Sequence, residues 1–309
     1  MCVAFWALEH KDYALILCAN RDEYLTRRTV DARFHGSLEH APGSTRTAPT
    51  TLSGIDLQRG GTWLGINRNG RVALITNILE TWTKHKCSRG HLVSSFLSGE
   101  DDQEQFFDHL AHSTWLDYPG FNLLLFTPSS SQASSSALKY DAKLVTNLGG
   151  GGPLATRHLN PCERVVSGVS NGVDGLFGDT WCKVNKGKEI LARILANTKE
   201  GVAEEVLMER LFELLSYQSP KHPTEFSQIR HNIEVTPFHL DPNLLPEADA
   251  YGSHYFGTRL STVILVRRDG TVLFVERDIW RLGCHGHPVK AERGSERVFE
   301  FHLDRPFAS

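Results

Sequence analysis

The chain has 309 residues, of which 40% are hydrophobic and 22% are charged, as is ordinary for a globular protein. Its net charge of −3 and its lack of a basic block argue against nucleic acid as a main partner. No apolar stretch approaches the roughly 18 residues of a membrane-spanning helix, and the first residues lack the pattern of a secretory signal. We therefore expect a cytoplasmic protein with no transmembrane segment.

The six cysteines are scattered along the chain and form no close pair. In a chain of this length, that pattern indicates reduced thiols and no disulfide framework. The segment Cys284-His285-Gly286-His287 lacks the spacing and the second ligand pair of a zinc site. We expect it to be a surface loop, and we predict no metal site.

Cys2 is the first residue with evident chemical potential. If the initiator Met1 is removed, Cys2 carries a thiol and a free α-amine on one carbon, with ordinary pKa values near ~8.5 and ~7.7. An N-terminal amine that activates its own side chain is a known form of nucleophilic catalysis. The alternative is that Cys2 is a small buried residue at the start of a strand.

A hairpin is predicted at the start of the chain. Two apolar runs, residues 3–8 and 14–19, flank a short polar break. Asn20, Arg21, Asp22 and Glu23 follow the second run, so they should close the second strand and face Cys2 across the ladder. An alternative for Arg21 is a structural ion pair with Asp22 or Glu23.

The middle of the chain alternates strands and helices. Residues 26–59 are predicted to be a long loop, and residues 60–67 and 71–77 a hairpin around Asn69-Gly70 that ends on Asn77. Helices are expected over residues 90–97 and 103–112, and a buried strand over residues 121–126. Serine-rich residues 129–136 should form a loop, and the four glycines of residues 149–152 a turn.

The last part repeats this order. Residues 165–171 read as a strand ending on Asn171, residues 188–197 and 202–214 as amphipathic helices, residues 216–256 as irregular, and residues 260–266 and 271–276 as a hairpin. Short turns between strands predict antiparallel sheets, and grouped helices predict separate layers. No repeat or linker interrupts the chain, so we predict one domain, residues 1–309.

Several motifs together resemble the NRDE family, also called the transport and Golgi organization protein 2 family. The resemblance spans nearly the whole chain. The motifs, in order, are Met1-Cys2, Asn20-Arg21-Asp22-Glu23, Gly61-Thr62-Trp63-Leu64-Gly65-Ile66, Thr76-Asn77, Gly120-Phe121-Asn122-Leu123, Gly168-Val169-Ser170-Asn171 and Tyr255-Phe256-Gly257-Thr258-Arg259.

That family in turn resembles the N-terminal-nucleophile hydrolases of the choloylglycine hydrolase and penicillin V acylase type. The resemblance implies an α+β fold, a four-layer αββα sandwich of antiparallel sheets. The implied catalytic residues are Cys2 as nucleophile, Asp22 beside its α-amine, Asn77 as an oxyanion-hole donor, Asn171 as the second site asparagine, and Arg259. The implied binding residues are Asn20, Arg21, Glu23 and Trp63.

For three of these residues the sequence leaves a structural alternative open. Asn77 and Asn171 would then be turn formers at strand ends, and Arg259 an exposed strand residue. One arginine of the hydrolase group falls on Ala19 here, while Arg21 lies inside the motif.

The resemblance favours a hydrolase or acyltransferase that acts on a non-peptide amide or a thioester. The alternative is a non-catalytic binding or trafficking protein on the same fold, which would handle haem, acyl-CoA or lipid and serve Golgi organization and protein secretion. We expect a small acyl, lipid or haem ligand and no cofactor other than haem, which only the resemblance suggests. Golgi or mitochondrial association is likewise implied only by the resemblance.

Overall fold

The computed structural model describes most of the chain: residues 2–36, 49–80, 85–99, 105–106, 110, 117–129, 137–175, 181–198, 203–220, 222–240, 255–292 and 294–304. Its internal contacts divide the chain into two compact units, each built from separate stretches. The first unit comprises residues 1–27, 160–267 and 272–300, and the second comprises residues 28–159, 268–271 and 301–309. The single domain expected from sequence stays a prediction.

The first unit is built on a sheet that has seven strands among the described residues. Its strand order is β10-β1-β2-β12-β13-β16, and the short β11 pairs with β12. The long strands are almost wholly buried, because their apolar runs are continuous and do not alternate. The bounds are β1 Cys2–Ala7, β2 Tyr13–Tyr24, β10 Ser167–Val169, β11 Phe238–His239, β12 Tyr255–Arg267, β13 Thr271–Asp278 and β16 Glu296–His302.

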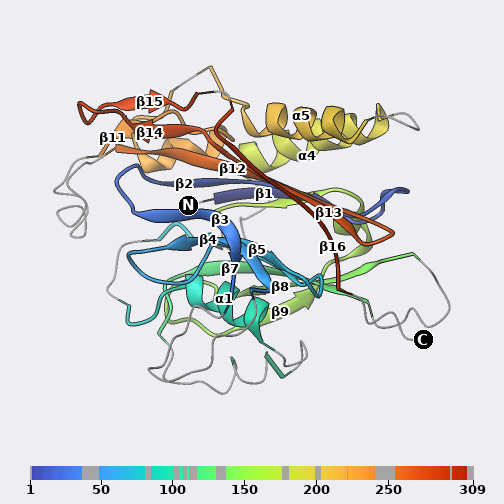
Figure 1. Cartoon of the computed structure of the whole chain (residues 1–309). Helices are drawn as coiled ribbons and strands as arrows, with labels where there is room; N and C mark the ends of the chain where they lie inside the picture. The colour runs from blue at the N-terminus through green and yellow to red at the C-terminus, as the bar shows by residue number, and fades with distance from the viewer. Residues whose placement is uncertain are drawn as a thin grey trace. The chain divides into compact units, whose positions relative to one another are not determined.

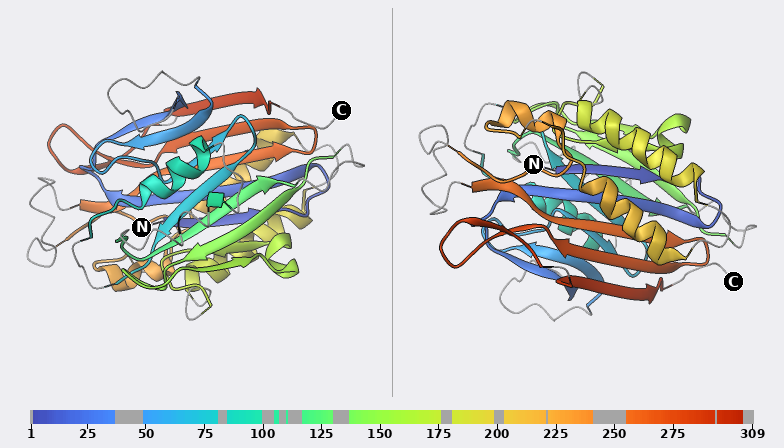
Figure 2. Two further views of the ribbon diagram at one scale, coloured as in Figure 1. Left: turned by 90° about the horizontal axis from the view of Figure 1, so that it is seen from below. Right: turned by 90° about the horizontal axis from the view of Figure 1, so that it is seen from above.

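Two amphipathic helices, α4 (Cys182–Ala196) and α5 (Glu204–Leu215), cover one face of this sheet (Figure 1). The right-hand view of Figure 2 looks onto both helices. Their apolar sides share a core cluster with Val3 and Phe5 of β1. Gly187 allows α4 to approach the sheet closely, since a Cβ atom there would lie 2.0 Å from the Phe5 ring.

Smaller elements complete the first unit. These are α3 (Pro161–Val165), the 3-10 helix η2 (Phe226–His231), and a two-stranded ribbon of β14 (Trp280–Leu282) and β15 (Pro288–Lys290). Helix α3 begins with a capping box in which Asn160 and Glu163 satisfy each other's backbone N–H groups.

The second unit contains a sheet of seven described strands in strict chain order, β3-β4-β5-β6-β7-β8-β9, all antiparallel. Helix α1 (Gly90–Ser98) packs on β5 and β6, as the left-hand view of Figure 2 shows. The bounds are β3 Thr29–His35, β4 Thr51–Asp56, β5 Leu64–Asn67, β6 Val72–Asn77, β7 Phe121–Pro128, β8 Tyr140–Thr146 and β9 Ala155–His158.

These elements confirm the predicted fold class, with antiparallel sheets, few helices and short hairpin connections. Strand β2 ends at Tyr24, so Asn20 to Glu23 close it, as predicted. Other bounds of the prediction were wrong, since α4 begins at Cys182 and not at residue 188. The predicted loop 26–59 contains β3 and β4, residues 165–171 contain only the short β10, and residues 60–67 contain only the four-residue β5. Most of the predicted helix 103–112 and loop 129–136 lies outside the described residues.

Candidate functional site

Cys2 is the first residue of β1 and lies directly opposite Arg21 on β2. Only 8% of Cys2 is exposed. Burial raises the pKa of its thiol, an effect that the positive charge of the amino terminus opposes. The Ser170 hydroxyl lies 3.0 Å from the Cys2 carbonyl oxygen and 3.1 Å from Asn171 Oδ1. The end of β10 therefore brings Asn171 close to the start of β1, while the role of Asn171 in a site stays a prediction.

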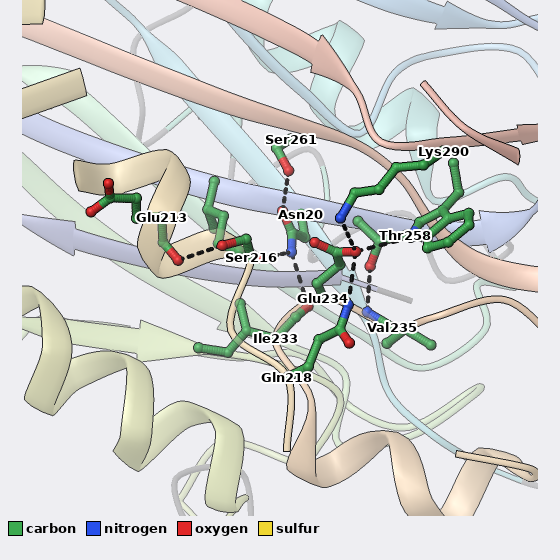
Figure 3. Close-up of polar contacts among 12 residues, drawn as sticks. Asn20, Glu213, Ser216, Gln218, Ile233, Glu234, Val235, Thr258, Ser261 and Lys290 are labelled. Carbon is green, nitrogen blue, oxygen red and sulfur yellow. Dashed lines mark hydrogen bonds and ion pairs between the residues drawn. The ribbon is translucent and has the colours of Figure 1, made fainter. Parts of the chain in front are cut away.

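Asp22 lies one position beyond Arg21 and is fully buried. Its Oδ1 accepts a 2.6 Å hydrogen bond from the Thr258 hydroxyl. The same hydroxyl oxygen accepts a 2.8 Å hydrogen bond from the Val235 backbone N–H, a contact drawn in Figure 3. Asp22 Oδ2 lies 3.7 Å from Nζ of Lys183, which is also fully buried. The Asp22 side chain is therefore held by two other elements of the first unit, β12 and α4.

Asn20 fastens the sheet to the segment that follows α5 (Figure 3). Its Nδ2 donates to the carbonyl oxygens of Leu215 and Ile233 at 2.8 and 2.9 Å, and its Oδ1 accepts from Ser261 at 2.6 Å. Both amide hydrogens of Asn20 are thus engaged within the protein. Its contacts indicate an anchoring role next to the site.

A cluster of charges lies at the same end of the sheet. Glu23 pairs with Arg27 at 3.3 Å, and Arg259 Nη1 donates to the Arg27 carbonyl oxygen. Burial alone would raise the pKa of Glu23, but Arg27, the amino terminus and Arg21 together lower it to about 2. The pKa of Arg259 is lowered to about 10, mainly by burial and secondly by the positive charge of Arg21. Arg259 is the extra residue of a bulge in β12, which separates it from the regular register with β2.

Glu234 joins the segment between η2 and β11 to the β14–β15 ribbon. Its Oε1 accepts hydrogen bonds from Gln218, Trp280 and Lys290 at 2.9, 3.0 and 3.2 Å (Figure 3). The neighbours of Glu234 on either side, Ile233 and Val235, are the residues that contact Asn20 and Thr258. This segment therefore connects the ribbon to the site.

Sequence reasoning missed Lys183 and Thr258. The signal for Lys183 was present, since it precedes Gly187, Leu191 and Ile194 at helical spacing and so belongs to the buried face of α4. It was overlooked because the helix was predicted to begin only at residue 188. Thr258 was quoted within a motif, but only the register of β12 with β2 places it opposite Asp22.

Asn77 and Trp63 belong to the second unit. Asn77 is the last residue of β6 and pairs with Phe121 of β7. The Trp63 side chain is buried and lies against Gly54 of β4. A role for Asn77 or Trp63 beside Cys2 stays a prediction.

In the described part of the chain, no group of three or more His, Cys, Asp or Glu side chains is arranged to hold a metal ion. Cys284 is exposed, in the turn between β14 and β15. None of the helices described combines the length and the apolar character that crossing a membrane requires.

The fold is that of the N-terminal-nucleophile hydrolases. Penicillin V acylase from Agrobacterium tumefaciens is similar over 98% of this chain and 86% of its own, at 12% identity and a TM-score of 0.51. The C2A mutant of conjugated bile acid hydrolase from Clostridium perfringens is similar over 97% of this chain and 96% of its own, at 10% identity and a TM-score of 0.50. At these identities the likeness shows the fold alone.

The chain belongs to the Transport and Golgi organisation 2 family, whose model matches residues 1–281. The Transport and Golgi organization protein 2 homolog of Bos taurus is 30% identical over 290 residues, which cover 90% of this chain and 93% of that protein. The Homo sapiens homolog is 29% identical over 288 residues, with the same coverage.

Proposed function

We propose that this protein is a cysteine N-terminal-nucleophile hydrolase or acyltransferase that acts on a non-peptide amide or a thioester. The observation that carries the proposal is the position of Cys2 as the first residue of a buried strand, opposite Arg21 and beside the buried Asp22. Buried charges grouped around one potential nucleophile are typical of catalytic sites. Removal of Met1 is part of the proposal, because it frees the α-amine of Cys2.

In the proposed reaction, the α-amine takes the proton of the Cys2 thiol, and the thiolate attacks the acyl carbon of the substrate. The tetrahedral intermediate collapses when the C–N or C–S bond breaks, and the α-ammonium returns the proton to the leaving amine or thiol. The acyl group is then held on Cys2 as a thioester. Water, or a second amine or thiol, attacks this thioester and releases the acyl group.

Asn77 and Asn171 are the proposed donors to the oxyanion. One such donor contributes roughly 3–4 kcal/mol to transition-state stabilisation in related chemistry. Asn171 is supported by its hydrogen-bonded link through Ser170 to Cys2. Asp22 is proposed to hold the α-ammonium, and Arg21 and Arg259 to orient the substrate.

A panel of amide and thioester substrates, followed by mass spectrometry, tests the proposal. We expect an acyl adduct on the peptide that begins with Cys2, and no adduct or turnover in Cys2→Ala. The matched control is Cys162→Ala, which removes an exposed thiol and should leave turnover unchanged. Turnover that persists in Cys2→Ala would refute the proposal.

The alternative function is non-catalytic handling of haem, acyl-CoA or lipid in Golgi organization. The names of the relatives refer to transport and Golgi organization, and they support only that part of this alternative. Two binding measurements address it, a haem titration followed by visible absorbance and a thermal shift with long-chain acyl-CoA. Saturable binding that is unchanged in Cys2→Ala, together with an unmodified Cys2, would favour this alternative.

A further inference from the structure

Lys183 is the least expected residue near the site. It lies in the first turn of α4, and its side chain is fully buried. A lysine is almost never buried to this extent unless it has a charged partner. The partner here is Asp22 on β2, with Lys183 Nζ 3.7 Å from Asp22 Oδ2. We infer that Lys183 is a positioning residue that keeps the Asp22 carboxyl group ionised beside Cys2. This inference rests on the proposed function for its catalytic meaning.

The hydrogen bonds of Asp22 fix how its carboxyl group is turned. The Thr258 hydroxyl accepts a hydrogen bond from the Val235 N–H and donates one to Asp22 Oδ1. In this arrangement Asp22 Oδ1 is an acceptor. The other oxygen, Oδ2, is the one that lies toward Lys183. At 3.7 Å, the positive charge of a Lys183 ammonium group opposes a proton on Asp22 Oδ2 and favours the ionised carboxyl group.

Burial is the largest effect on both groups, and it raises the pKa of Asp22 and lowers the pKa of Lys183. Among the effects that oppose burial at Asp22, the charge of Lys183 is the largest, followed by the amino terminus and Thr258. The charges of Asp22 and Cys2 oppose burial at Lys183. Each member of the 3.7 Å pair therefore favours the ionised form of the other. The Trp181 ring lies 5.5 Å from Nζ of Lys183, with Arg230 over the same ring. On the same helix, Lys186 is at the surface and pairs with Glu189.

The consequence for the proposed reaction is direct. An ionised Asp22 attracts the α-ammonium of Cys2 and favours its protonated form. Without Lys183, the buried carboxyl group would take up a proton and this attraction would be lost. Lys183 therefore acts through Asp22 and needs no contact with the substrate.

Infrared difference spectroscopy at neutral pH tests the protonation of Asp22 without any substrate. Spectra of each protein are compared with those of the same protein carrying Asp22→Asn, so that only the signal of Asp22 remains. We expect no protonated-carboxyl band from Asp22 in the wild type, such a band in Lys183→Met, and none in Lys183→Arg, which keeps the charge. Lys183→Gln replaces Lys183→Met if the latter fails to fold. Lys186→Met is the matched control on the same helix and should match the wild type.

A second readout follows the α-amine of Cys2. Reductive methylation across a pH series should show the amine titrating about one pH unit lower in Lys183→Met than in the wild type, since a negative neighbour has been lost. A protonated Asp22 in the wild type, or an ionised Asp22 in both Lys183→Met and Lys183→Gln, would overturn the inference. If Met1 is retained, the proposed function fails, while the infrared comparison still decides the role of Lys183.

Discussion

The two sheets of this protein bury polar groups of different kinds. In the first unit, the buried polar residues include five charged ones: Arg21, Asp22, Lys183, Glu234 and Glu276. In the described part of the second unit, the buried polar residues are threonines, serines, asparagines and one carboxylate, Asp56. That carboxylate accepts hydrogen bonds from the backbone N–H groups of Gln58 and Arg59, in the turn after β4. Its role is therefore to hold a turn.

This difference distinguishes polar groups that stabilise the fold from charged groups that are candidates for a role in catalysis. Neutral amides and hydroxyls satisfy backbone groups at modest cost, whereas a buried charge is expensive and must be paired. The paired charges Asp22 and Lys183 gather at the end of β1 where Cys2 lies. Substitutions in the two units should therefore differ in size, in pH dependence and in their effect on Cys2.

The largest effect is expected for Asp22→Ala. This change leaves the ammonium group of Lys183 buried without its carboxylate, and breaking such a pair costs about 3–5 kcal/mol of unfolding free energy. Urea unfolding at neutral pH measures the loss. Glu189→Gln, which removes an exposed carboxylate paired with Lys186, is the control and should leave the midpoint unchanged. Equal midpoints for Asp22→Ala and the wild type would contradict the account.

Leu125→Ala should destabilise the second unit without changing the chemistry of Cys2. Leu125 is fully buried in β7, so its truncation leaves a cavity that costs about 3 kcal/mol. The measurements are urea unfolding and the rate of Cys2 alkylation under native conditions. A large change in alkylation rate in the folded variant would mean that the second unit does more than provide structure.

Glu23→Gln should show a pH-dependent loss of stability. The pKa of Glu23 is lowered from 4.5 to about 2 in the folded protein, so its stabilising effect is present above pH 4.5 and is lost as the pH falls through 2. Allowing for the partly exposed side chain, we expect the variant to be less stable by about 2 kcal/mol at pH 7. Unfolding curves of the variant and the wild type, measured from pH 7 down to pH 2, should differ at pH 7 and coincide near pH 2. A constant difference at every pH would be inconsistent with the charge cluster.

The smallest effect is expected for Asn147→Ala in the second unit. Asn147 Oδ1 accepts from the Phe121 N–H at 2.9 Å, and its Nδ2 donates to the Pro119 carbonyl oxygen at 3.1 Å. Loss of these neutral hydrogen bonds should cost about 1–2 kcal/mol. Because no ionisable group is involved, the loss should be the same at pH 5 and pH 8. A stability loss that differed markedly between pH 5 and pH 8 would contradict the proposed difference between the two units.

The sequence predicted the hairpins well, because their signals are local. Asn69-Gly70 and Asp269-Gly270 mark turns between apolar runs, and strands β5 with β6 and β12 with β13 follow. Strands β3 and β4 were missed, since glycine, proline and polar residues interrupt that part of the chain. Strand β3 pairs with β4, and β4 pairs with β5. This pairing stabilises the two strands where the local sequence has little strand propensity.

The candidate site was only partly predictable, for a related reason. The placement of Cys2 opposite Arg21 follows from a hairpin, and that prediction is confirmed. The contacts of Asp22 with Thr258 and Lys183 join residues more than 150 positions apart, through the order of strands and the packing of α4. No short-range pattern specifies such contacts.

The most direct test of the central claim is intact mass spectrometry of the purified protein, before and after brief treatment with a thiol alkylator. The account predicts loss of Met1 and faster modification of the buried Cys2 than of the exposed Cys162. Retention of Met1, or a Cys2 no more reactive than Cys162, would contradict a nucleophile at the amino terminus.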